Sequence, residues 1–145
     1  DATARVGCRA IISRGWANIG TETLPPHVFA LDYAPYAWLF PQMNAVIHHG
    51  GSGTTGMALR SGVPSLVVAF GADQPYWGQR TAALGAGLAP LHIKTLTADA
   101  LATAIQRLTH DATLRRRADE VSAALRREDG IAEAVHWIGE YVGAP

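Results

Sequence analysis

Apolar residues occur along the first two thirds of the chain in short blocks separated by turn residues, a pattern that predicts strands joined by helices. Four blocks have the length and composition of strands: Arg9–Ser13, Val28–Leu31, Ala45–His48 and Ser65–Phe70. Segments of helical composition follow them at residues 38–43, 54–61 and 74–84, and a short edge strand is expected within 88–93. Because parallel strands require crossover connections, this alternation predicts an α/β fold with a parallel sheet flanked by helices.

The pattern changes after Thr97, where apolar residues repeat at helical spacing. Three such stretches are present, at residues 101–108, 114–125 and 131–142. Thr97 and Asp111 stand where the N-caps of the first two helices belong. The basic run 115–117 is interpreted as the solvated face of the second helix rather than as a phosphate site.

Composition narrows the class of partner. The chain has 145 residues and 48% hydrophobic content, enough for one core, so a single domain over residues 1–145 is expected. Twelve basic residues balance twelve acidic ones, which argues against a nucleic-acid partner. Cys8 is the only cysteine, which excludes an internal disulfide and fits a cytoplasmic location. The longest apolar runs are too short for an integral membrane segment, so a specific small ligand is expected.

A glycine-rich turn follows the third predicted strand, in the segment His48–Thr55 (HHGGSGTT). In a parallel sheet, ligands bind beyond the carboxyl ends of the strands, where the chain enters a helix. Gly50, Gly51 and Gly53 allow main-chain amides to approach an anion closely, and Ser52, Thr54 and Thr55 add hydroxyl donors; the helix N-terminus adds free amides. The turn therefore predicts a diphosphate site, and a purely structural tight turn is the alternative.

His48 and His49 end the same strand, and successive strand residues face opposite ways. We therefore expect only one of them to reach the ligand, and His48 is the candidate, because its imidazole could stabilise a departing diphosphate. His49 is interpreted as a structural histidine. No metal site and no Ser-His-Asp triad are expected, since no carboxylate stands at a suitable spacing.

Asp73 and Gln74 follow the fourth predicted strand and so lie on the same rim of the sheet. A carboxylate accepts hydroxyl protons, and an amide both donates and accepts, so the pair suits the adjacent hydroxyls of a sugar. The alternative makes Asp73 the N-cap of the helix that begins at Gln74, and both roles are compatible. Several side chains near the rim are weaker candidates for binding a base or ribose: Ser13, Trp16, Tyr33 and Tyr36.

These motifs resemble the GT-B fold glycosyltransferases of family 1, in the bacterial natural-product and sterol glucosyltransferase branch. The resemblance covers nearly the whole chain and rests on the segments 13–16 (SRGW), 38–41 (WLFP), 48–55 (HHGGSGTT), 62–64 (GVP) and 73–78 (DQPYWG). It implies a Rossmann-like C-terminal half that binds a UDP- or TDP-sugar, with the diphosphate at the His48 turn, the sugar at Asp73 and Gln74, and no further cofactor.

The resemblance also implies a two-domain enzyme that transfers a sugar, expected to be glucose, with inversion to a hydroxyl of a lipophilic acceptor such as a sterol or polyketide. The acceptor domain and its general base are expected to be absent here, and the donor domain to lack its first strand, so the isolated chain should be inactive. Plant members carry a tryptophan and a glutamate where Tyr33 and Gly56 stand, which leaves the choice of base open.

Two alternatives remain at this stage. The first alternative is an NAD(P)-type dinucleotide-binding domain. Residues 51–56 match the pattern G-x-G-x-x-G, and Asp73 stands 17 residues beyond Gly56, near the distance expected of a ribose-binding acid. Against it, Asp73 stands three residues past the predicted strand that ends at Phe70. The other is a noncatalytic subunit that binds a sugar nucleotide.

Overall fold

The computed structural model describes residues 1–15 and 23–143. A short helix, α1 (Ala2–Val6), precedes two parallel strands, β1 (Ala10–Ser13) and β2 (Val28–Leu31). Their register places Ala10 opposite Val28 and Ser13 opposite Leu31, so both strands end at the same level. The segments that follow each strand therefore start side by side.

The second half of the fold is a three-stranded parallel sheet. Helix α2 (Tyr36–Leu39) and the 3-10 turn η1 (Phe40–Gln42) lead into β3 (Val46–His48), and the strand order is β3-β4-β5, with β4 (Ser65–Ala69) central and β5 (Leu91–His92) at the edge. All five residues of β4 are buried, as expected of a central parallel strand covered on both faces. Helices α3 (Ser52–Ser61) and α4 (Gln74–Ala83) form the crossovers.

The main core lies between this sheet and the C-terminal helices α5 (Ala98–His110) and α6 (Ala112–Leu125). Its buried members are Leu66, Val68, Leu88, Ala104, Leu108 and Leu114. Both predicted N-caps are confirmed: the Thr97 hydroxyl accepts from the Ala100 amide at 3.1 Å, and the Asp111 carboxylate accepts from the Thr113 amide at 2.9 Å. A second cluster packs α2 and α3 against β3 around Leu39, Phe40 and Val63.

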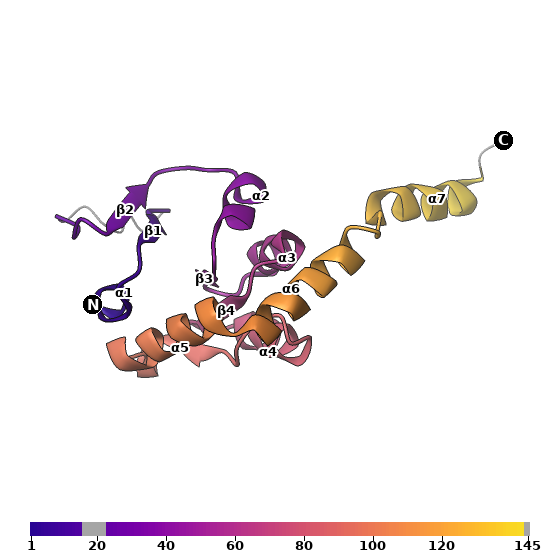
Figure 1. The fold of residues 1–145 in the computed structure, drawn as a ribbon. Helices are drawn as coiled ribbons and strands as arrows, with labels where there is room; N and C mark the ends of the chain where they lie inside the picture. Colours follow the sequence, from indigo (N-terminus) through magenta and orange to yellow (C-terminus); the bar gives the residue numbers. More distant parts are fainter. Residues whose placement is uncertain (16–22, 144–145) are drawn as a thin grey trace.

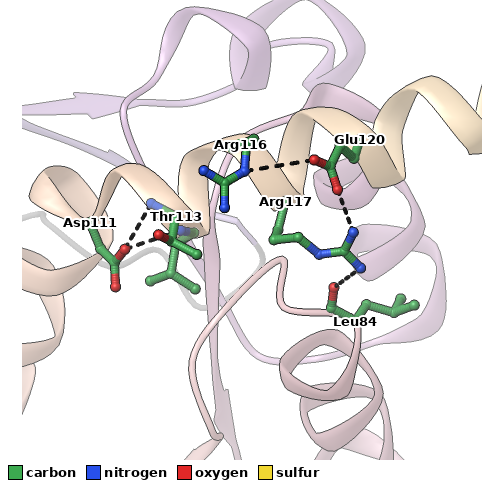
Figure 2. A network of polar contacts seen from close by, with 7 residues as sticks. Leu84, Asp111, Thr113, Arg116, Arg117 and Glu120 are labelled. Carbon is green, nitrogen blue, oxygen red and sulfur yellow. Dashed lines mark hydrogen bonds and ion pairs between the residues drawn. The ribbon is translucent and has the colours of Figure 1, made fainter.

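The arginines of α6 form ion pairs on its own surface, which confirms the interpretation of a solvated face (Figure 2). Arg116 Nε lies 3.8 Å from Glu120 Oε1, and Arg117 pairs with the same carboxylate. Arg117 Nη2 also donates to the Leu84 carbonyl at 3.2 Å, which ties α6 to the end of α4. The basic run 115–117 thus pairs with carboxylates three and four residues along the same helix, as on a solvated helix face.

The last helix, α7 (Gly130–Val142), extends away from the rest of the fold (Figure 1). None of its residues is buried, although its stripe of apolar side chains includes Ile131, Val135 and Ile138. Over the part of the chain that the structure describes, no helix has the length and apolar character needed to cross a membrane.

The predicted α/β class with parallel strands and flanking helices is confirmed. The strands fall into two sheets rather than one, because β1 and β3 each pair on one side only and not with each other. The predicted edge strand 88–93 is reduced to Leu91–His92, and the chain before it meets β4 only at an isolated parallel bridge between Gly87 and Ser65. Helix α3 begins at Ser52, two residues earlier than predicted, and α1 was not predicted.

Candidate functional site

Two segments far apart in sequence meet where β3 and β4 end. They are the glycine-rich turn before α3 and the start of α4. A β-carbon on Gly50 would lie 3.0 Å from the Gln74 carbonyl oxygen and 3.1 Å from Gln74 Cβ, so the two segments are in direct contact. Gly50 has φ +95°, a conformation that other residues rarely adopt. The structure thus brings the predicted diphosphate turn and the predicted sugar pair together.

The N-terminus of α3 is open to a ligand. Gly51 occupies the N-cap position and, having no side chain, caps none of the amides of the first turn. The first intrahelical bond runs from the Thr55 amide to the Gly51 carbonyl at 2.9 Å. The amides of the residues before it, Ser52, Gly53 and Thr54, have no carbonyl four residues earlier within the helix to bind. This end of the helix therefore offers amides and a positive dipole end to an anion.

His48 is buried beside this helix end, with 9% of its surface exposed. Its Nδ1 accepts a hydrogen bond from the Gly50 amide at 3.1 Å. Burial, with a smaller contribution from the neighbouring His49, lowers the pKa of His48 to about 4. At neutral pH the ring is therefore uncharged, and because Nδ1 accepts, its proton must sit on Nε2.

The Nε2 atom of His48 is buried and, among the described residues, has no hydrogen-bond partner. A buried donor without a partner is costly, so such a group is expected to have a partner in the functional state. The structure thus gives His48 a neutral imidazole with one N–H to donate, and its contact with a ligand stays a prediction.

His49 faces the other way, as strand geometry predicts. Its side chain is exposed, and a β-carbon on Gly51 would lie 2.5 Å from its Nε2 atom, so the ring covers Gly51. The two histidines thus occupy opposite faces of the strand end, one buried and one in solvent.

The hydroxyl side chains of the turn differ in orientation. Thr55 is 2% exposed, and its hydroxyl donates to the Gly51 carbonyl at 2.9 Å. Since its amide bonds the same carbonyl, both of its donors are used inside the helix, and its predicted place among the diphosphate ligands is not supported by the geometry. Ser52 is exposed and Thr54 half-buried, so both remain candidates.

Asp73 stands at the N-cap position of α4 but does not cap the helix with its side chain. Its Oδ2 atom instead accepts a hydrogen bond from the indole N–H of Trp77 at 2.7 Å. Asp73 is exposed, and no hydrogen bond among the described residues uses its other carboxylate oxygen. Asp73 thus occupies the predicted N-cap position, but its side chain does not bond the amides of the first turn. The carboxylate can still accept a hydrogen bond from a hydroxyl.

Gln74 is held by the loop that follows β4. Its Oε1 accepts from the Phe70 amide at 2.7 Å and from the Gly71 amide at 3.3 Å. Two amide donors fix which end of the side chain is the oxygen, so the NH₂ group points elsewhere. The expectation that Gln74 both donates to and accepts from a ligand is corrected: only its donors are left.

The candidates for base and ribose binding are scattered. Ser13 is exposed at the end of β1, and Tyr33 is 81% exposed just after β2. Tyr36 stacks on Phe40 with ring centroids 4.6 Å apart, so its face is used in packing. Trp16 lies outside the described residues.

Sequence reasoning missed two side-chain contacts that follow the ends of strands. One is the hydrogen bond between Trp77 and Asp73, which the i,i+4 spacing of these residues at the start of a helix could have indicated. Arg14 Nη1 donates to Asp32 Oδ1 at 3.0 Å, which joins the segments after β1 and β2. Both strands end at the same level in the parallel register, and that relation could have indicated the pair.

A hollow of about 500 Å³ lies elsewhere and is lined by Gln106, Arg107, His110 and Asp111. It is shallow and gathers no buried polar groups, so the chemistry favours the open rim beside His48. Among residues 1–15 and 23–143, no cluster of three His, Cys, Asp or Glu side chains could hold a metal ion.

Comparison with known proteins gives a consistent result. Residues 2–137 match the family described as erythromycin biosynthesis protein CIII-like, C-terminal domain. A sterol 3-beta-glucosyltransferase of Arabidopsis thaliana is 38% identical over 136 residues, which are 93% of this chain and 21% of that protein. One of Pichia angusta is 38% identical over 144 residues, 95% of this chain and 11% of that protein. The chain thus spans about a fifth or less of these relatives.

Solved structures agree on the fold. The glycotransferase of kitacinnamycin superposes with a TM-score of 0.81 at 28% identity, over 91% of this chain and 34% of that one. Glycosyltransferase VinC, solved in complex with dTDP, gives 0.74 at 32% identity, over 86% of this chain and 32% of that one. The expected architecture, the C-terminal half of a GT-B glycosyltransferase, is confirmed, and the dinucleotide-binding alternative is not favoured.

Proposed function

Because the chain belongs to the family of erythromycin biosynthesis protein CIII-like C-terminal domains, we propose that it binds the nucleoside diphosphate-sugar donor of a glycosyltransferase. The donor diphosphate lies at the N-terminus of α3 beside His48, and the sugar lies toward Asp73 and Gln74. UDP- and dTDP-sugars are the candidates, since the related VinC was solved with dTDP.

The observation that carries this proposal is the unpartnered Nε2–H of His48 beside an uncapped helix end. A diphosphate oxygen supplies the missing acceptor, and the amides of Ser52, Gly53 and Thr54 supply further donors. Gly50 supports the arrangement, because its missing side chain lets the turn lie against Gln74. The diphosphate and sugar parts of the proposed site are therefore neighbours.

The chemistry of transfer follows from these donors. An acceptor hydroxyl gives its proton to a general base and attacks the anomeric carbon as the bond from that carbon to the diphosphate oxygen breaks, and the bonding electrons leave with the diphosphate. Donors already in place around that oxygen stabilise the charge that develops on it. A neutral His48 contributes a hydrogen bond without needing to be charged, and displacement from the opposite face inverts the anomeric centre.

We propose that the acceptor-binding site and the general base lie outside the described residues. We propose a lipophilic hydroxyl acceptor such as a sterol or polyketide, in view of the sterol 3-beta-glucosyltransferases among the relatives. We also place the protein in the cytoplasm, because its single Cys8 is free.

Titration calorimetry of the chain with UDP, dTDP and NAD tests the proposal. We expect heat from at least one of the two diphosphates and none from NAD. Replacement His48→Ala should weaken diphosphate binding at least tenfold, the loss of a hydrogen bond to a charged group being worth about 1.5–3 kcal/mol. His136→Ala, on the exposed helix α7, is the matched control and should bind within about twofold of the parent. Tighter binding of NAD, or an unaffected His48 variant, would overturn the proposal.

A further inference from the structure

Resting on the proposed function, we propose that Trp77 is a positioning residue for the donor sugar: its indole N–H holds the Asp73 carboxylate in the orientation that receives a sugar hydroxyl. The contact is Trp77 Nε1 to Asp73 Oδ2 at 2.7 Å. It joins two side chains one turn apart on α4, at the rim of the sheet where the sugar is placed.

The Asp73 side chain has little else to fix it. It is exposed and makes no capping bond to the first turn of α4. A side chain without such contacts exchanges between rotamers, so neither carboxylate oxygen would have a fixed position relative to a ligand. The indole N–H binds one oxygen and leaves the other as the acceptor, and a charge-assisted bond of this kind is strong enough to select one rotamer.

Trp77 is itself held in place. Its ring meets the Tyr76 ring edge-on, with centroids 5.2 Å apart, and its carbonyl accepts from the Thr81 hydroxyl at 2.9 Å. Trp77 as a whole is half-buried, whereas Tyr76 is exposed. Orientation therefore passes from the packed helix through the indole to the carboxylate.

Gln74 is oriented by separate bonds. Its Oε1 is bound to the Phe70 and Gly71 amides, so only its NH₂ donors are free. The rim thus offers one acceptor at Asp73 and one donor group at Gln74. Two neighbouring hydroxyls of a hexose match this order when one donates to the carboxylate and the other accepts from the amide.

The hydrogen bond between Trp77 and Asp73 would have the same length if it only stabilised the helix. The test therefore separates a role in sugar binding from a role in stability. Titrations use the 145-residue chain with four ligands: UDP, dTDP, UDP-glucose and dTDP-glucose. Trp77→Phe keeps an aromatic ring but removes the N–H. Trp137→Phe, on the exposed helix α7, is the matched control, and the urea midpoint of each variant is measured alongside.

We expect Trp77→Phe to weaken sugar-nucleotide binding about tenfold, while binding of the bare diphosphate stays within about twofold, because the indole contacts neither phosphate nor base. In an Asp73→Ala background the same replacement should have no further effect, since Trp77 acts through Asp73. The control should bind all four ligands as the parent does.

Equal effects of Trp77→Phe on diphosphate and sugar nucleotide would overturn the inference, and so would losses that add to those of Asp73→Ala. The proposed function would still stand in either case. A parent chain that bound neither UDP nor dTDP would instead overturn the proposed function itself.

Discussion

Gly50 lies directly against Val67 of β4, with room for a hydrogen atom but not for a methyl group. A β-carbon on Gly50 would lie 2.6 Å from Val67 Cγ1, well inside van der Waals contact. The close approach lets the turn after β3 cross the end of β4 and reach Gln74. The two halves of the proposed donor site therefore depend on one missing side chain.

Gly50→Ala should disrupt this approach and the turn together. The φ of +95° strains any other residue, and the added methyl clashes with Val67, so we expect a loss of about 2–4 kcal/mol in the free energy of unfolding. Gly56→Ala is the control, since Gly56 lies inside α3 and an added β-carbon there contacts nothing. The free energy of unfolding of the Gly56→Ala variant should rise by about 0.5–1 kcal/mol, and urea unfolding measures both variants. A Gly50 variant as stable as the parent would contradict the packing described.

Much of this fold could be predicted from the pattern of the sequence. Strand β2 has the predicted bounds, and the caps at Thr97 and Asp111 follow from local side-chain chemistry that needs no tertiary context. The division into two sheets could not be predicted in this way, because which strand edges pair is decided by long-range contacts and not by the apolar period.

The site shows the same limit at the level of single atoms. The type and order of residues in His48–Thr55 and at Asp73 and Gln74 indicated which segments converge. They did not indicate that the Gln74 oxygen binds the Phe70 amide or that the Thr55 hydroxyl turns inward. Such choices depend on which backbone groups are left unpaired after folding, and a linear pattern does not record this.

Stability should fall in mild acid because of His48. Its folded pKa is about 4 against an ordinary value of 6.5, so the unfolded chain takes up a proton first as the pH drops. The contribution is complete above pH 6.5 and is lost progressively toward pH 4, by up to about 3 kcal/mol. Urea unfolding at pH 7, 6 and 5 measures this slope. His48→Asn should flatten it, and an unchanged slope in that variant would assign the effect to other groups.

Gln74→Glu separates the two ends of the Gln74 side chain. A carboxylate can still accept from the Phe70 and Gly71 amides, so the free energy of unfolding should change by less than about 0.5 kcal/mol. The NH₂ donors are lost and a negative charge is added, so sugar-nucleotide binding should fall at least tenfold. Calorimetry and urea unfolding on the same sample check both. If binding were retained, the amide donors would not contact the ligand.

Thr55→Val should affect stability rather than binding. It removes the hydroxyl that donates to the Gly51 carbonyl at a buried position, and we expect a loss of about 1 kcal/mol or slightly more. Diphosphate affinity should stay within about threefold, since this hydroxyl points into the helix. Thr54→Val is the companion variant, because Thr54 is half-buried in the same turn. Loss of affinity in the Thr55 variant alone would return this residue to the ligand set.

Removal of α7 should leave the rest of the fold intact. No side chain of Gly130–Val142 is buried, so a chain ending at Asp129 gives up no core contact. Its free energy of unfolding should match that of the parent to about 0.5 kcal/mol. The exposed apolar stripe of Ile131, Val135 and Ile138 disappears with the helix, so the shortened chain should self-associate less as its concentration rises. Size-exclusion chromatography over a concentration series, with urea unfolding, makes the comparison. A loss of about 2 kcal/mol or more would mean that α7 packs on the body in solution.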